Sequence, residues 1–402
     1  MNRQSLAIGA TYFFLTASPG CWTPVLSNVL EAHGWGAWIV SAFLIKTMAV
    51  LVSPLAISAQ ADQRLPAEKI VAVLLTIGAI FQVLAFREVR VDGSPVRFLF
   101  WFAVQSLITA PTFALLNAIT FAYLDGEVSR FGGLRVWGTI GWIVAGVAVS
   151  LLGYDASPAV GYLSAGAGVI AGGLCLTLPT ALPPSAPATR WSERLGLTAL
   201  GLLRSRDIGV VVIVACLFMM PLTAFYLHTP LFLNDLGTQR IAAVMSVGQI
   251  TEVFALFGLG YLMRRVRLRT LMVCGFLFAI ARYALFAATQ SQWMLLLGIA
   301  FHGLCWSLFF EVSRAFLELR APPEYRAQVQ ALMALGTSGL GSAVGTITLG
   351  MLYAAVVVAG PGWSAYWWLL TIWCAACGIG FVLVFRDRPV AGESTDSPGD
   401  ES

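Results

Sequence analysis

The sequence predicts an all-α membrane protein with twelve transmembrane helices, on three observations. Of its 402 residues, 58% are hydrophobic and only 11% are charged, whereas soluble domains carry about 25% charged residues. Apolar runs of about 20 residues, the length that spans a bilayer, recur along the chain. Polar breaks rich in arginine separate these runs. The composition disfavours a soluble enzyme and a disordered regulator, and a net charge of only +4 suggests no polyanion partner.

The apolar runs between polar breaks define the predicted spans in order. The first six lie near residues 6–30, 38–59, 70–86, 97–124, 133–153 and 158–180, and the second six near residues 207–233, 241–263, 269–288, 292–313, 326–357 and 363–386. The first run is too long for the apolar segment of a cleaved signal peptide, and the chain keeps returning to the membrane after it. We therefore expect it to remain as the first helix.

Arginine and lysine mark the breaks and predict the orientation, because cytoplasmic loops carry an excess of both. With the N-terminus inside, the inner segments hold Arg3, Arg64, Lys69, Arg130, Arg190, Arg194, Arg204, Arg206, Arg264, Arg265, Arg267, Arg269, Arg320, Arg326, Arg386 and Arg388, whereas the outer loops hold Arg87, Arg90, Arg97 and Arg240. This bias, together with an even number of spans, predicts that both termini are cytoplasmic.

The longest interruption divides the chain into two halves of six spans each. It contains Leu-Pro-Pro-Ser-Ala-Pro and four arginines, a composition that makes a poor helix core. We expect an N-terminal six-helix bundle over residues 1–181, a cytoplasmic linker over 182–206 and a C-terminal six-helix bundle over 207–386. Residues 387–402 are acidic and polar and are expected to form a disordered cytoplasmic tail.

Few charged residues fall inside the predicted spans. They are Lys46, Arg135, Glu252, Arg282, Glu311 and Arg314. A charge at the centre of a membrane helix costs about 2.5–3.5 kcal/mol on insertion scales, so such a residue is expected to line a wet cavity, to pair or to move protons. Lys46 and Arg282 have no obvious neighbours on their helix faces, and a structural pair or a loop contact is the favoured interpretation for both.

The other charged residues also have structural interpretations. Arg135 lies near the cytoplasmic start of its span, where its side chain could extend to the membrane surface. Glu252 could belong to a structural ion pair, and Glu311 and Arg314 could neutralise each other. His302, the histidine of the tenth span, could be a packing residue. These alternatives stand beside the functional ones.

Helical spacing groups polar and aromatic residues on common faces. The faces carry Arg135, Thr139 and Trp142 in the fifth span, Gln249 and Glu252 in the eighth, and His302 and Trp306 in the tenth. Each face combines hydrogen-bonding groups with a ring or a charge. An aromatic polar solute would use this mixture, with rings to stack on and donors and acceptors for its hydroxyl or amide groups.

The sequence carries no signature of an enzyme or of an ATP-driven pump. Neither lysine follows a glycine, so no Walker A phosphate loop is present. The three histidines are far apart, no paired metal-ligand motif appears, and no aspartate lies in the middle of a span. We expect no catalytic residue, no cofactor, no metal and no nucleic-acid partner. The expected partners are a small polar solute and the lipid bilayer, and the protein is expected to be a monomer.

Six segments spread over nearly the whole chain carry a family resemblance. They are Pro111–Thr120 (PTFALLNAIT), Leu134–Trp142 (LRVWGTIGW), Met245–Glu252 (MSVGQITE), Ala281–Phe286 (ARYALF), Phe301–Phe310 (FHGLCWSLFF) and Arg326–Gln330 (RAQVQ). In this order they resemble the fourth, fifth, eighth, ninth, tenth and eleventh helices of the bacterial nucleoside:proton symporters, a family of the major facilitator superfamily. The second segment is the most specific.

The resemblance implies a major facilitator fold, in which two six-helix bundles with inverted repeats enclose a central cavity. It also implies proton-coupled uptake of nucleosides by alternating access in a bacterial cytoplasmic (inner) membrane. The family's substrate contacts match Arg135, Thr139, Gln249 and Glu252. Further contact positions align to residues that depart from the family pattern, namely Trp142, Thr223, Tyr226, His302 and Trp306.

The most important departure is Ser307, which stands where the family carries an aspartate in the tenth helix. Glu311 follows four residues later, one turn on along the same face of an α-helix, at a position where the family is apolar. We hypothesise that the proton-coupling carboxylate has moved by one turn, so that Glu311 or Glu252 takes the proton. A carboxylic acid in a low-dielectric cavity keeps its proton at higher pH than in water, which suits a proton carrier.

Two further expectations complete the interpretation. Asp62 and Arg64, in the loop after the second span, match the acidic and basic residues of the superfamily's gating-loop motif, although Ser58 replaces its first glycine. The altered contacts leave a second function open, namely proton-coupled symport of another small polar solute such as a sugar or an aromatic acid. A channel would show a flux insensitive to the proton gradient, and a non-transporting sensor would bind without accumulation.

Overall fold

The computed structural model describes residues 3–58, 66–125, 130–180 and 197–385, and it is helical with no β-strand in this part of the chain. The helices before residue 181, here called the first half, are α1 (Arg3–Trp22), α2 (Leu26–Ala32), α3 (Ile39–Ser58), α4 (Ala67–Arg90), α5 (Pro95–Thr109), α6 (Thr112–Leu124), α7 (Phe131–Leu151) and α8 (Ala159–Cys175). The predicted tail 387–402, most of the predicted linker 182–206 and the gating-loop residues Asp62 and Arg64 lie outside the described residues.

The helices after residue 196 form the second half. They are α10 (Arg206–Leu222), α11 (Ala224–Leu227), α12 (Thr229–Asp235), α13 (Ile241–Arg265), α14 (Leu268–Ala288), α15 (Gln292–Trp306), α16 (Val312–Arg320), α17 (Arg326–Ala334), α18 (Ser342–Tyr353) and α19 (Trp363–Val384). Three π-helical segments interrupt these helices, at Ser307–Glu311, Leu335–Gly341 and Ala354–Val358. Such segments are rare and are frequently found at functional sites.

Nine helical stretches in the described residues are long and apolar enough to cross a bilayer. They correspond to the predicted spans from residue 70 to 153 and from residue 207 to 386. The predicted spans 38–59 and 158–180 match shorter apolar helices, Gly36–Val52 and Ala159–Cys175. The first predicted span carries more polar residues and is divided between α1 and α2. The composition therefore establishes a multi-pass helical membrane protein.

Prolines divide three predicted spans that the hydropathy pattern shows as continuous. Pro24 lies in the turn between α1 and α2, and Pro111 lies between α5 and α6. A proline has no backbone N–H to donate to the preceding helical turn, so the helix breaks or changes direction there. The predicted span 207–233 is divided in the same way into α10, α11 and α12, with Pro230 in the first turn of α12.

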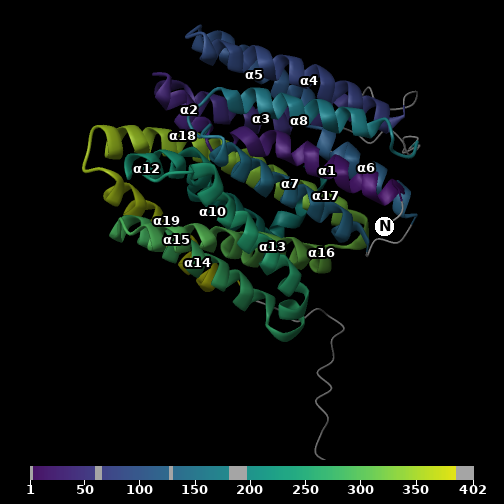
Figure 1. The fold of residues 1–402 in the computed structure, drawn as a ribbon. Helices are drawn as coiled ribbons and strands as arrows, with labels where there is room; N and C mark the ends of the chain where they lie inside the picture. Colours follow the sequence, from purple (N-terminus) through teal and green to yellow (C-terminus); the bar gives the residue numbers. More distant parts are fainter. Residues whose placement is uncertain (1–2, 59–65, 126–129, 181–196, 386–402) are drawn as a thin grey trace, which may run out of the picture.

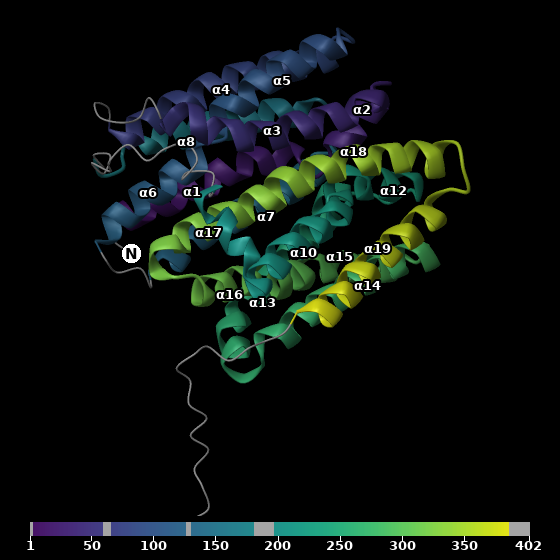
Figure 2. The ribbon, with the colours of Figure 1, turned by 180° about the vertical axis from the view of Figure 1, so that it is seen from behind.

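The two halves lie side by side and their helices run roughly parallel between two ends of the molecule (Figure 1). The first half lies above the second in both views (Figure 2). Helices α7 and α13, and helices α3 and α18, pack against each other across the boundary between the halves. We call the end where α1 begins the Arg3 end, and the opposite end, which carries α2 and α12, the Trp35 end.

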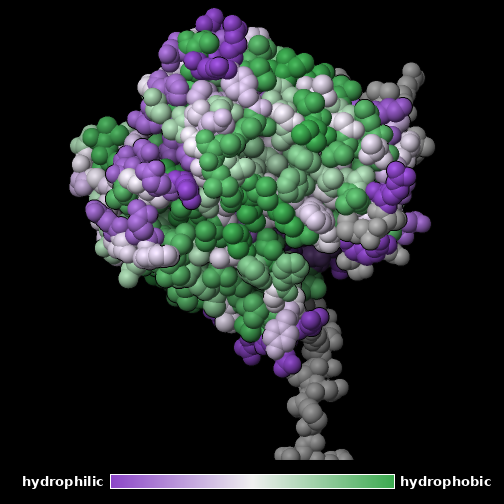
Figure 3. Space-filling model, viewed as in Figure 1, coloured by the Kyte–Doolittle hydropathy of each residue, from purple (hydrophilic) through white to green (hydrophobic). Residues whose placement is uncertain are grey.

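The surface between the two ends is hydrophobic. Figure 3 shows a broad apolar surface over the helices, with hydrophilic residues gathered towards the two ends. Large apolar side chains on this surface are exposed, among them Phe254 at 72% and Phe257 at 76%. A contiguous apolar surface of this size is incompatible with water and fits a lipid environment.

Candidate functional site

A cavity with charged, polar and apolar walls lies between the two halves of the molecule. Its main chamber has a volume of about 750 Å³, and an adjoining recess has a volume of about 200 Å³. Arg135, Tyr226 and Glu252 line both spaces, so the two are continuous. The walls come from α1, α3, α6 and α7 of the first half and from α10, α11, α13, α15, α16, α18 and two π-helical segments of the second. Sites for small molecules in proteins commonly have volumes of about 300–1,000 Å³.

All nine residues predicted to contact a substrate line this cavity. Arg135, Tyr226 and Glu252 line both spaces, Thr139, Trp142 and Gln249 line the recess, and Thr223, His302 and Trp306 line the main chamber. Glu311, predicted as a proton carrier, also lines the main chamber. The structure thus brings residues from four separate helical regions to one place, and their role in binding stays a prediction.

The first-half wall is built on the close packing of α1 and α7. A side chain at Gly141 would meet the backbone oxygen of Phe13 at 2.1 Å, so only glycine permits this approach. Thr16 of α1 donates a hydrogen bond to the backbone oxygen of Gly138. The guanidinium of Arg135 lies 5.4 Å from the ring of Phe113 and forms no ion pair with the described residues. Its donors therefore remain open to the recess.

The second-half wall is built on the close packing of α13 and α15. A side chain at Gly303 would meet the backbone nitrogen of Glu252 at 2.2 Å, so the two helices touch at this point. Gln249 donates from Nε2 to the hydroxyl of Tyr226 at 2.7 Å, whereas its Oε1 has no partner among the described residues. The ring of Tyr226 meets that of Trp142 edge to face, with centroids 6.0 Å apart. This contact joins the two halves at the cavity.

Two of the predicted residues lie at the junction between α10 and α11 or just after it. Thr223 occupies the junction between these helices, and its hydroxyl donates to the backbone oxygen of Met219 at 3.0 Å. Tyr226 follows within the short α11. Thr223 keeps right-handed helical dihedrals, and residues three apart share one face of a helix, so both side chains reach the cavity.

The region of Ser307 and Glu311 differs from the sequence-based expectation. That expectation assumed α-helical spacing, but Ser307–Glu311 is a π-helical turn. Its i→i+5 bonding brings residues five apart above one another, so Glu311 follows Trp306 and both line the main chamber. Ser307 is fully buried and its hydroxyl has no hydrogen-bond partner among the described residues.

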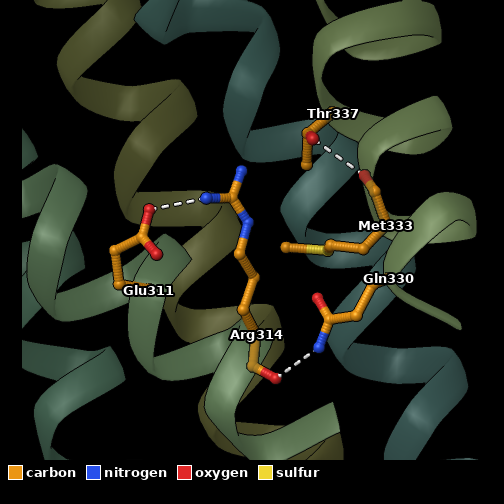
Figure 4. A network of polar contacts seen from close by, with 5 residues as sticks. All are labelled: Glu311, Arg314, Gln330, Met333 and Thr337. Carbon is orange, nitrogen blue, oxygen red and sulfur yellow. Dashed lines mark hydrogen bonds and ion pairs between the residues drawn. The ribbon is translucent and has the colours of Figure 1, made fainter. Parts of the chain in front are cut away.

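Glu311 forms the ion pair that the sequence offered as an alternative. Its Oε1 lies 2.6 Å from Nη1 of Arg314, and Figure 4 shows the two side chains directed at each other. The backbone oxygen of Arg314 accepts a hydrogen bond from Nε2 of Gln330 at 2.9 Å. Glu252, in contrast, has no ion-pair partner among the described residues. The two acidic residues of the cavity are therefore electrostatically different.

The sequence left the partners of Lys46, Arg282 and His302 unnamed, and the structure supplies them. Lys46 lines the main chamber and a further recess of about 340 Å³. Its Nζ donates to Thr23 Oγ1 at 3.2 Å and lies 4.9 Å from the ring centroid of Trp22. Phe225 stacks on His302, and Arg282 bonds to the same imidazole. Helical periodicity within one segment could not reveal these contacts, because each joins two different helices.

These observations define a class of protein. A multi-pass helical membrane protein with a charged cavity between two packed halves has the architecture of a secondary transporter, which moves a solute without ATP. Comparison with known families identifies which one: residues 9–389 match the family model described as nucleoside H⁺ symporter. The chain belongs to this family. It is a proton-coupled nucleoside transporter and not an enzyme.

Individual relatives agree with the family assignment. The YegT protein of Escherichia coli K12 is 28% identical over 389 residues, covering 88% of this chain and 91% of the relative. Nucleoside permease NupG of the same organism is 26% identical over 375 residues, covering 88% and 89%. The crystal structure of a point mutant of nucleoside transporter NupG superposes with a TM-score of 0.87 at 24% identity, covering 96% of this chain and all of that one. The fold is therefore that of NupG.

Proposed function

We propose that this transporter binds its nucleoside in the central cavity and carries it, with a proton, into the cytoplasm of a bacterial cell. The observation that supports this most is the meeting of Arg135 and Thr139 from the first half with Gln249 and Glu252 from the second around one recess. A solute held there contacts both halves. Its binding can therefore be coupled to their relative movement, as alternating access requires.

The side chains of the cavity suit the two parts of a nucleoside. Trp142, Tyr226 and Trp306 offer aromatic surfaces on which a base can stack. The donors of Arg135 and the hydroxyl of Thr139 both face the recess. Ribose hydroxyls both donate and accept, so they can satisfy these groups.

We infer the membrane orientation from the arginine distribution. Among the described residues, most basic residues in the breaks, such as Lys69, Arg264 and Arg326, lie at helix termini of the Arg3 end, so we take this end as cytoplasmic and both termini as inside. We further propose that residues 1–181 and residues 207–386 each form a six-helix bundle with inverted repeats. Residues 182–206 connect the two bundles. Glu311 and Arg314, which lie towards the Arg3 end, are then on the cytoplasmic side of the cavity.

We propose that Glu252 carries the coupling proton. Glu252 forms no ion pair with the described residues, although Arg135 lines the same recess, and a carboxylate largely removed from water favours its neutral form. Glu311 already has a counter-charge in Arg314 at 2.6 Å, which favours its ionised form in this conformation. Glu311 can exchange a proton only in a state where this ion pair separates. The unpaired acid is thus the better proton carrier of the two.

Uptake into proteoliposomes tests both parts of the proposal. Wild-type protein should accumulate a radiolabelled nucleoside when the outside is acidic, and unlabelled nucleosides should compete better than sugars or aromatic acids. Glu252→Gln should abolish accumulation driven by the pH gradient but retain exchange of labelled for unlabelled nucleoside. Glu311→Gln should retain most of the accumulation. If both variants accumulate nucleoside as the wild type does, neither acid is the proton carrier.

One observation favours a second candidate substrate, an aromatic acid. The ammonium of Lys46 lies against the ring of Trp22 and has no acidic partner among the described residues. A carboxylate and a ring together would satisfy both side chains. A thermal-shift screen of the purified protein against nucleosides, nucleobases, sugars and aromatic acids separates the candidates. Stabilisation by aromatic acids alone would remove nucleosides as the substrate.

A further inference from the structure

Arg282 is a fully buried cation next to the cavity. It lies within α14 and has 0% exposure, and no acidic side chain pairs with it among the described residues. Its guanidinium carbon lies 4.3 Å from the ring centroid of Tyr283 and 5.6 Å from that of Phe225. These rings stabilise a desolvated cation in part. A charge at this depth is costly and usually functional, yet Arg282 does not line the cavity itself.

The hydrogen bond between Arg282 and His302 determines the protonation of a residue that does line the cavity. Its Nη1 lies 2.8 Å from Nδ1 of His302, whereas its Nε and Nη2 have no partner among the described residues. A guanidinium can only donate, so Nδ1 of His302 must accept and carries no proton. The remaining nitrogen, Nε2, then holds the single proton of a neutral imidazole. A protonated ring would place N–H against N–H and one cation beside another.

The orientation of the His302 ring is fixed by its neighbours. It stacks on Phe225 with centroids 3.6 Å apart and planes at 3°. A side chain at Gly248 would lie 3.3 Å from Cδ2 of His302, so this glycine lets α13 pack against the ring edge. Nε2 has no protein partner among the described residues. It is not one of the buried polar atoms that lack a partner, so it is accessible. Since His302 lines the main chamber, its Nε2–H is open to that chamber.

We propose that Arg282 is a positioning residue that holds His302 in the Nε2–H tautomer, and that this N–H selects nucleosides presenting a hydrogen-bond acceptor, such as a base carbonyl oxygen, at that point. The inference rests on the proposed binding of nucleosides in the cavity. A hydroxyl group in place of this N–H could donate or accept. A histidine held in this way only donates, so it discriminates between bases that a hydroxyl would accept equally.

NMR of the purified protein tests the tautomer without any substrate. Only three histidines are present. Labelling their ring nitrogens with an NMR-active isotope therefore gives three pairs of signals, and the pair that is missing in His302→Phe belongs to residue 302. In the wild type, the signals of His302 should show an unprotonated Nδ1 and a protonated Nε2. Arg282→Lys should give the same result, because it keeps a charged donor. A proton on Nδ1, or on both nitrogens, at the pH of transport would overturn the proposal.

Transport selectivity tests the consequence. The probes are inosine against purine riboside, which lacks the base oxygen, and uridine against zebularine, which lacks the corresponding pyrimidine oxygen. In at least one pair the wild type should prefer the carbonyl-bearing nucleoside by about tenfold in kcat/KM, the effect of losing one buried hydrogen bond. Arg282→Lys should keep this preference. Arg282→Met should reduce it to about twofold or less, because the freed ring can present either nitrogen.

The ratio within one variant cancels differences in the amount of folded protein. A double variant, Arg282→Met with His302→Phe, replaces both polar partners by apolar side chains, a change that buried pairs often tolerate, and it should transport both members of each pair equally. An unchanged preference in Arg282→Met or in the double variant, or no preference in the wild type, would contradict the proposal. If the wild type carries no nucleoside at all, the proposed substrate is wrong, whereas the NMR result still decides the tautomer.

Discussion

The two ends of the molecule differ in how the halves meet. At the Trp35 end, hydrogen bonds link first half to second: Asp155 Oδ1 accepts from the backbone N–H of Ala242 at 2.7 Å, and Ser150 Oγ accepts from that of Ala243 at 2.9 Å. Towards the Arg3 end, the cavity separates the halves, and the ion pair of Glu311 with Arg314 lies within the second half. In the proposed orientation the protein is closed to the outside and its solute site faces the cytoplasm.

The closed end depends on an unusual helix cap. Helix α13 begins after Arg240, which adopts a left-handed conformation with φ 58° and supplies no side-chain cap. The first N–H groups of a helix need acceptors, and here Ser150 and Asp155 of the other half provide them. Ser150 also donates to Asp155 at 2.8 Å, which orders the pair. The cap of α13 thus consists of hydrogen bonds to the first half. These bonds are lost whenever the outer end opens.

Blocking the closed end should produce the largest effect on transport. A side chain at Gly146 of α7 would meet Ser246 Oγ of α13 at 2.5 Å, so Gly146→Trp should hold the halves apart at the outer end. Uptake should fall on the order of 100-fold, as expected when a two-state equilibrium is displaced to one side. Gly166→Trp is the matched control, because a side chain there meets nothing within 4 Å. Equal uptake by the two variants would break the comparison between the ends.

Removing the cap should produce a smaller shift. Asp155→Ala removes an acceptor at a helix N-terminus, a loss of about 1–2 kcal/mol, and should favour the outward-open state by about tenfold. Asp155→Asn keeps an acceptor oxygen and should stay close to wild type. The readout is labelling, from outside, of a cysteine placed in the outer part of the cavity. If alanine and asparagine variants label alike, the carboxylate does not hold the outer end closed.

The smallest effect is expected at the contact between α2 and the second half. Ser27 donates to the backbone oxygen of Leu227 at 2.8 Å, and one neutral hydrogen bond contributes about 0.5–1.5 kcal/mol. Ser27→Ala should therefore raise outside labelling by only a few-fold. Ser164→Ala, which removes a bond to Ser18 within the first half, should leave labelling unchanged. A larger effect from the control would show that the contact between the halves is not what matters.

The sequence predicted the cavity better than it predicted the contacts around it. Arg135, Thr139 and Trp142 share a face because α7 is an unbroken α-helix, and the structure places all three on the cavity. Periodicity works there because all the information lies in one helix. The apolar runs also located the hydrophobic helices. They did not reveal the breaks at Pro24 and Pro111, because hydropathy does not record that proline lacks a backbone N–H.

Contacts between helices could not be predicted from one segment at a time. Arg282 and His302 are 20 residues apart on α14 and α15, and only packing brings them to 2.8 Å. The cap from Asp155 to Ala242 spans 87 positions. The π-helical turn at Ser307–Glu311 changes the register that an α-helix assigns to Glu311. None of these features can be predicted from a single segment. The proposed selectivity of the site depends on the contact between Arg282 and His302.

In the proposed mechanism, one cavity couples a nucleoside to a proton through Glu252. The most direct measurement records nucleoside and proton movement together, by adding a nucleoside outside proteoliposomes that enclose a pH indicator and start without a pH gradient. Wild-type protein should acidify the interior as nucleoside enters, and Glu252→Gln should exchange nucleoside without any acidification. Nucleoside entry without a pH change in the wild type, or undiminished acidification in Glu252→Gln, would contradict the account.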